Sequence, residues 1–69
     1  MTRVIVKKDW LHECGRREYT ADAAFEVVES YTRMGWRFYD IIVPWQEKPW
    51  TVIEWRVNGR PFSVDEIVL

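Results

Sequence analysis

The side chains with the most reactive chemistry in this sequence stand together at His12, Glu13 and Cys14. A histidine beside a cysteine can activate a nucleophile or supply two ligands to zinc. On an extended segment, His12 and Cys14 would share one side of the chain. Zinc needs a third and a fourth ligand, and the 69 residues include one histidine and one cysteine. We therefore expect a polar loop here, without a metal site or thiol catalysis.

The acidic residues and the glycines provide no better basis for an active site. No spacing among Asp40, Glu54, Asp65 and Glu66 specifies a paired acid and base. The three glycines are isolated and form no phosphate-binding loop. A chain this short rarely encloses a cleft that excludes water from a substrate. We therefore expect a protein that is not an enzyme and that uses no cofactor and no small-molecule substrate.

The totals exclude further classes of partner. Ten basic and eleven acidic residues give a net charge of -1, without the basic excess of a nucleic-acid-binding domain. A content of 48% hydrophobic and 30% charged residues suits one globular domain over residues 1–69. The apolar run at residues 4–6 is too short for a signal peptide or a membrane span. A lone cysteine suits a reducing compartment, so we expect a cytoplasmic protein.

Aromatic residues are in surplus. Five Trp, three Tyr and three Phe make up 16% of the chain, more rings than a core of this size hides easily. Trp and Tyr are also enriched at binding hot spots. Two interpretations stay open: a tryptophan-rich core with some half-exposed rings, or a surface that holds a partner.

The elements that would position these rings include one helix. In residues 21–34 apolar side chains recur at helical spacing, with charged residues on the other side. Thr20 is a suitable N-cap, Asp22 suits the first turn, and Gly35 can take the left-handed position after the helix. We therefore expect an amphipathic helix over 21–34 that buries Ala24, Val27, Val28 and Tyr31.

Four strands complete the expected fold. Runs of β-branched and aromatic residues predict them at 3–9, 36–43, 50–57 and 60–64. Residues 10–19 are either a loop or a short extra hairpin, and residues 44–49 form a loop. The expected fold class is α+β in the order β-α-β-β-β, with the helix packed on a small, mainly antiparallel sheet.

The pair Asn58-Gly59 predicts the turn of the last hairpin, because both residues of such a turn need a positive φ. The turn fixes a register of Val57 opposite Arg60, Trp55 opposite Phe62 and Ile53 opposite Val64. Pro61 lacks an N–H, which marks the last strand as an edge. Ser63 and Glu66 have the spacing of a capping box, so a helical turn is the alternative for the tail.

This register divides the side chains between two faces. If Val43 lies opposite Trp50 in the preceding hairpin, the helix-covered face holds Trp36, Phe38, Trp55 and Phe62. The opposite face is then half apolar and uncovered, which usually marks an interaction site. Its candidate partner-binding residues are Arg37, Tyr39, Ile41, Trp45, Trp50, Val52 and Arg56, with an aromatic centre and an arginine edge.

A protein partner or a second copy of the chain would suit that face, and the sequence predicts a protein-binding module. The alternative is that residues 3–14 fold across the face and cover it. Two other functions stay open: stacking of single-stranded nucleic acid on exposed rings, and a small homodimeric bacterial protein of unknown role. The missing basic excess counts against nucleic acid.

One stretch of about a quarter of the chain follows the pattern Thr-x-Asp-x-Ala-x-Glu, then Glu, then Gly and an aromatic residue. The positions are Thr20, Asp22, Ala24, Glu26, Glu29, Gly35 and Trp36. With a one-residue gap, this resembles the helix and following strand of the small RNA polymerase inhibitor of T7-like phages. The resemblance implies a phage protein that blocks a host enzyme by surface contact, and we transfer no functional residue from it.

Overall fold

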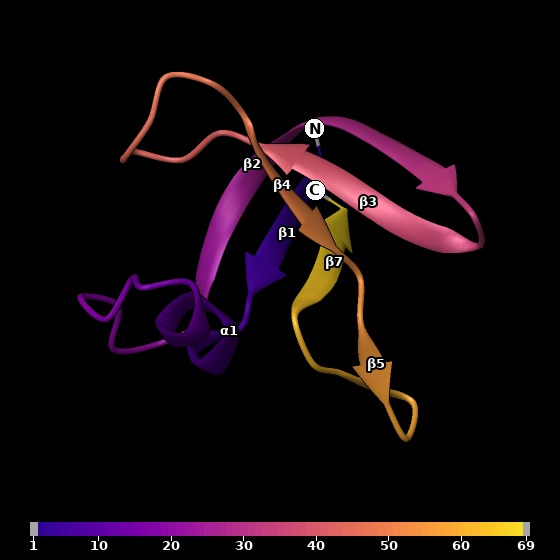
Figure 1. Cartoon of the computed structure of the whole chain (residues 1–69), viewed down its shortest axis with the longest axis horizontal. Coiled ribbons are helices and arrows are strands. Elements are labelled where there is room, and N and C mark those ends of the chain that lie inside the picture. The colour runs from indigo at the N-terminus through magenta and orange to yellow at the C-terminus, as the bar shows by residue number, and fades with distance from the viewer. Residues whose placement is uncertain (1, 69) are drawn as a thin grey trace.

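Antiparallel strands build most of this protein. The computed structural model describes the backbone of residues 2–68 and the side chains of residues 2–65, and it is 50% strand and 9% helix. Five strands form one sheet in the order β4-β3-β2-β1-β7, which curls into a half-barrel (Figure 1). The elements are β1 (Thr2–Val6), α1 (Lys8–Glu13), β2 (Ala23–Arg33), β3 (Trp36–Ile41), β4 (Trp50–Ile53), β5 (Arg56–Val57), β6 (Arg60–Pro61) and β7 (Val64–Val68).

The expected α+β fold is wrong, because most of residues 21–34 forms β2 and no amphipathic helix packs on the sheet. The register of β2 with β3 shifts between Val27 and Glu29, which marks a β-bulge. A bulge moves the following side chains to the other face. Phe25 and Val27 therefore contact the core before the bulge, whereas Tyr31 lies outside after it. Apolar residues divided in this way fall at the spacing of a helix.

Met34 and Gly35 form the two-residue turn that joins β2 to β3. Their φ angles are 54° and 82°, which suits the twist of a tight hairpin. Gly35 thus has the expected left-handed backbone, but in a hairpin and not after a helix. The Met34 side chain is 92% exposed, so no packing of that side chain offsets the strain of a left-handed residue that is not glycine.

The helix α1 lies in a segment that was expected to end a strand and begin a loop or hairpin. Leu11 is fully buried and anchors α1 in the core. The Asp22 carboxylate accepts hydrogen bonds from the Lys8 backbone N–H at 2.7 Å and from the Lys7 ammonium at 2.9 Å. Lys7 stands at the N-cap without a side-chain cap of its own. Asp22 therefore satisfies an N–H that the first helical turn leaves unpaired.

Changing Asp22 to Asn is expected to lower the melting temperature at neutral pH and to have less effect in acid. The hydrogen bond from Lys7 and then that from Lys8 lower the pKa of the Asp22 carboxyl from its ordinary value of 3.8. The ionised Asp22 carboxylate therefore stabilises the folded protein fully at pH values above the ordinary pKa. This stabilisation is lost as the pH falls through the lowered pKa of the folded state.

The measurement is the melting temperature of both chains from neutral pH down to strong acid. The difference between native chain and variant should close in acid. The control is Glu47→Gln in the exposed loop, which should match the native chain at every pH. A difference for Asp22→Asn that does not change with pH would contradict this account.

The strands β3 and β4 pair two residues away from the expected register. Ile41, not Val43, lies opposite Trp50. Because side chains alternate with a period of two, a shift of two leaves each residue on its expected face. The division of β3 and β4 side chains between two faces is therefore confirmed.

The choice of the inner face is wrong. Tyr39 and Val52 are 2% exposed and Ile41 is fully buried, although these residues were expected on the uncovered face. The core cluster consists of Val4, Val6, Leu11, Phe25, Tyr39, Ile41, Val43, Val52 and Val64. Residues of β1 and α1 thus pack against this face, as the alternative with residues 3–14 predicted.

The hairpin at Asn58-Gly59 is confirmed. The two φ angles are 53° and 76°, and Val57 lies opposite Arg60. The Phe62 N–H donates to the Trp55 carbonyl oxygen at 2.7 Å, which extends the expected pairing by one step. Figure 1 shows this hairpin of β5 and β6 projecting beyond the main sheet.

Changing Gly59 to Val is expected to lower the free energy of unfolding by more than about 1 kcal/mol. No atom lies within 4 Å of a Cβ added at Gly59, so the cost comes from the positive φ and not from a clash. Gly59→Asn tolerates this φ and should cost less. Equal denaturation midpoints for the Val variant and the native chain would contradict this prediction.

The tail differs from both expectations. Ile53 does not pair with Val64, because the chain bends at Phe62 and Ser63, and β7 then pairs antiparallel with β1. The alternative helical turn in the tail is also wrong. Val64 lies opposite Val6, and both are fully buried, so β7 joins the core through its first residue.

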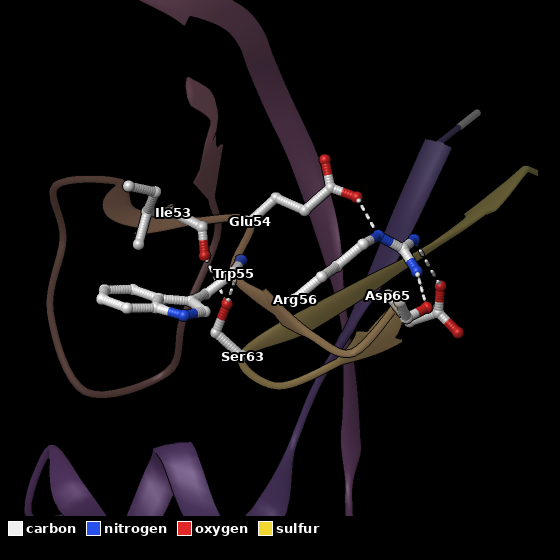
Figure 2. A network of polar contacts seen from close by, with 7 residues as sticks. Ile53, Glu54, Trp55, Arg56, Ser63 and Asp65 are labelled. Carbon is white, nitrogen blue, oxygen red and sulfur yellow. Dashed lines mark hydrogen bonds and ion pairs between the residues drawn. The ribbon is translucent and has the colours of Figure 1, made fainter. Parts of the chain in front are cut away.

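Ser63 connects the two outer strands of the sheet (Figure 2). Its fully buried hydroxyl accepts a hydrogen bond from the Trp55 N–H at 2.9 Å and donates one to the Ile53 carbonyl oxygen. Ile53 ends β4, and Ser63 directly precedes β7. The Ser63 hydroxyl therefore ties the open side of the half-barrel together at this end.

Candidate binding surface

The seven residues expected to bind a partner fall into two groups. Burial leaves little of the first group for another molecule to touch. This group consists of the buried Tyr39, Ile41 and Val52 and the half-buried Trp45 and Trp50. The second group is Arg37 and Arg56, which are exposed and line one cleft beside Trp36. The structure thus brings the two arginines together and places the aromatic centre inside.

Trp45 closes the core at the loop between β3 and β4. Its ring makes edge contacts with the rings of Trp50, Phe25 and Tyr19, at centroid distances of 5.2, 5.9 and 6.0 Å. The Arg16 guanidinium lies over the same indole at 4.8 Å. These contacts on most sides make Trp45 part of the stable interior.

Aromatic side chains also cover the outer side of β2, β3 and β4. Tyr31 stacks on Phe38 across the first hairpin, with ring centroids 5.6 Å apart. Trp36 contacts Trp55 at 5.7 Å, and Ile53 lies opposite Phe38. We call Tyr31, Trp36, Phe38, Ile53 and Trp55 the outer aromatic face.

The two indoles of the outer aromatic face are open to water, whereas Tyr31, Phe38 and Ile53 are half-buried. Trp36 is 46% exposed and Trp55 is 44% exposed. Met34 projects from the turn beside Trp36, and Val57 and Phe62 are also exposed in the hairpin after Trp55. Single exposed apolar residues are common on protein surfaces, whereas a contiguous group of them marks an interaction site.

The charges around this face are uneven. Arg33 lies opposite Trp36 across the hairpin, and its guanidinium is 5.9 Å from the Tyr31 ring centroid. Toward the other end, the Asp40 carboxylate accepts hydrogen bonds from the Tyr31 and Thr51 hydroxyls at 3.3 and 2.6 Å. Cationic groups therefore lie near the β2–β3 turn, and a carboxylate lies near the middle of the sheet.

Arg56 belongs to a polar network on the other side of the chain from the Trp55 ring (Figure 2). Its guanidinium lies 3.2 Å from a Glu54 carboxylate oxygen and 3.8 Å from one of Asp65. These exposed ion pairs contribute little stability by themselves. The two carboxylates nevertheless compensate the positive charge of Arg56.

The His12 and Cys14 side chains do not act together. The His12 Nε2 lies 2.6 Å from the Tyr19 carbonyl oxygen, so that nitrogen donates its proton to the backbone. Burial, and after it the Glu13 carboxylate, raise the pKa of the Cys14 thiol, which disfavours the thiolate. No group of three His, Cys, Asp or Glu side chains within the described part of the chain is placed to hold a metal ion.

Sequence reasoning assigned Trp36, Phe38 and Trp55 to the core and gave Met34 to a helix. Gly35 between two runs rich in β-branched and aromatic residues was the available signal for a hairpin. No comparable signal identified the inner face, because the residues of 36–43 are apolar on both faces.

None of the helices in residues 2–68 is long and apolar enough to cross a membrane. Comparisons with protein-family models, with curated proteins and with solved structures gave no match. The stretch that resembles the phage inhibitor forms β2 and the start of β3, so the helix implied by that resemblance is absent from this stretch.

Proposed function

We propose that this protein is a non-enzymatic binding module whose outer aromatic face contacts a protein partner. The observation that carries the proposal is the pair of indoles of Trp36 and Trp55, each nearly half exposed and 5.7 Å apart, beside the exposed Met34. Aromatic residues, methionine and arginine are enriched where proteins meet. Removing this apolar surface from water favours association.

The conformation of Met34 supports the same surface. A methionine with positive φ and almost full exposure gains nothing from packing inside the domain. Strained residues of this kind concentrate at binding and catalytic sites. The Met34 side chain, which does not contribute to packing within the domain, would then contribute to binding by contacting the partner.

The proposed setting is the cytoplasm, which suits a chain with a single cysteine. A small inhibitor that acts by surface contact is one form of such a module. A homodimer is another, in which the partner is a second copy of the chain. Both forms require that the outer aromatic face is covered in the complex.

The test is affinity capture with three versions of the protein: the native chain, the double variant Trp36→Ser/Trp55→Ser, and the control Ile42→Ser. Ile42 is 54% exposed and lies outside the outer aromatic face. We expect the native chain and the control to retain the same protein, and the double variant to lose it. Sedimentation equilibrium of the native chain identifies a second copy as the partner.

Circular dichroism must show that all three versions are folded. Retention of the same partner by a folded double variant would overturn the proposal, because the two indoles would then be dispensable for binding.

A further inference from the structure

A cleft of about 390 Å3 opens at the end of the sheet where β2 turns into β3. It is lined by Thr32, Gly35, Trp36, Arg37, Glu54 and Arg56. Trp36 belongs both to this cleft and to the outer aromatic face. Arg37, Glu54 and Arg56 project from the opposite side of the sheet, so a molecule that packs on Trp36 and Trp55 reaches the cleft around the end of the sheet, where Gly35 and Trp36 line it.

Three of the lining residues form a row across β2, β3 and the residue that follows β4. Thr32 of β2 lies opposite Arg37 of β3, and the Glu54 N–H donates to the Arg37 carbonyl oxygen at 2.8 Å. The hydrogen bond from Glu54 and the pairing with Thr32 hold the backbone of Arg37 in the sheet. The Arg37 side chain therefore projects from a backbone that is fixed in the sheet.

The Arg37 guanidinium is the uncompensated charge of this cleft. Arg56 is paired with Glu54 and Asp65, so the Glu54 carboxylate is already engaged. Within residues 2–65, neither Arg37 nor Arg33 forms an ion pair. Arg33 lies opposite Trp36 across the hairpin, whereas Arg37, next to Trp36 in β3, projects from the other side of the sheet. The positive potential around Trp36 therefore attracts an anionic group.

We propose that the protein partner presents an acidic segment to this end of the sheet. One apolar side chain of the segment packs on the Trp36 and Trp55 indoles, and a neighbouring carboxylate enters the cleft. That carboxylate accepts hydrogen bonds from the Arg37 guanidinium, whose planar donors match a carboxylate in pairs. This inference rests on the proposed function and adds the chemistry of the partner.

Single-stranded nucleic acid suits the surface less well. A phosphate backbone that runs along stacked bases needs cations along its whole path. Here the arginines stand at one end, whereas Glu29 and Asp40 lie opposite each other farther along β2 and β3. Those carboxylates would repel phosphates, but a peptide with one acidic residue can avoid them.

The experiment selects binders from a random peptide library on the immobilised native chain. We expect enriched peptides in which Asp or Glu stands beside Trp, Phe or Leu. Binding of a selected peptide, measured by calorimetry, should weaken by about tenfold or more for Arg37→Gln, because a charge-assisted hydrogen bond is lost. Arg17→Gln is the matched control, since Arg17 is exposed and lies in the loop after α1.

The outcomes separate this inference from the proposed function. Neutral or basic peptides that depend on Trp36 would overturn the acidic segment and leave the binding face in place. Peptides that bind Trp36→Ser/Trp55→Ser unchanged, or no enrichment at all, would overturn the acidic segment, and the capture experiment would then decide the face. A mixed-sequence single-stranded DNA that binds more tightly than the peptides and depends on Arg37 would assign the site to nucleic acid instead.

Discussion

Changing Trp45 to Ala is expected to lower the free energy of unfolding by about 3 kcal/mol, whereas Trp55→Ala should lower it by about 1 kcal/mol or less. Both substitutions remove an indole that contacts another indole. Trp45 also packs on Phe25 and Tyr19 at the end of the core. The Trp55 ring is 44% exposed on the outer side of the sheet, so less contact area is lost with it.

This pair of variants tests which face is inside. Chemical denaturation measures both changes, and the denaturation slope shows whether the folded state stays compact. Equal losses would mean that the outer indoles are as structural as the inner ones. If Trp55→Ala lowers the free energy of unfolding more than Trp45→Ala does, the core lies on the face expected from the sequence, with Trp36, Phe38 and Trp55 inside.

Ser63→Ala is expected to lower the free energy of unfolding by about 2 kcal/mol or more. The substitution removes both hydrogen bonds of a fully buried hydroxyl and leaves the Ile53 carbonyl and the Trp55 N–H without this partner. Both bonds lie in a part-buried site, where a polar group left without a partner costs more than the lost bond itself.

Hydrogen exchange provides a second readout for the same variant. The Trp55 amide should exchange much faster in Ser63→Ala than in the native chain, while amides in the middle of β2 change less. Ser30→Ala is the control, because Ser30 is exposed on β2. If the Trp55 amide is protected from exchange equally in both chains, the Ser63 hydroxyl does not hold the ends of β4 and β7 together.

The locally encoded parts of the fold could be predicted from the sequence. Asn58-Gly59 defines its hairpin within four residues, since the required φ angles depend on those residues alone. The alternation of side chains in β3 and β4 was also predictable, and it survived a register error of two residues. Local signals were not sufficient everywhere, because the equally local turn at Met34 and Gly35 was expected to end a helix.

The parts that depend on distant contacts could not be predicted. The bulge near Val28 shifts β2 out of a simple alternation, and the resulting pattern matches a helix better than a strand. With that helix expected on Trp36 and Phe38, the wrong face became the core. Leu11, Val6 and Val64 cover the true inner face, and they come from the two ends of the sequence.

The candidate binding surface was missed for the same reason. The rings of Trp36, Phe38 and Trp55 were correctly placed on one face of the sheet, but that face was assigned to the interior, and Tyr31 was assigned to a helix. Of the predicted site residues, Arg37 and Arg56 remain available at the surface, since their charges keep them out of any core whichever face is inside.

The antiparallel pairing of β1 with β7 also determines when this sheet can be finished. Thr2 lies opposite Val68, and Figure 1 shows the N- and C-terminal ends beside each other. The hairpins of β2, β3 and β4 join near neighbours and close quickly, whereas a loop that spans the chain closes late. During synthesis, β1 leaves the ribosome before β7, and one edge of β1 stays unpaired until β7 follows. The core is therefore completed only when β7 has paired with β1, and this pairing joins the most distant segments of the sheet.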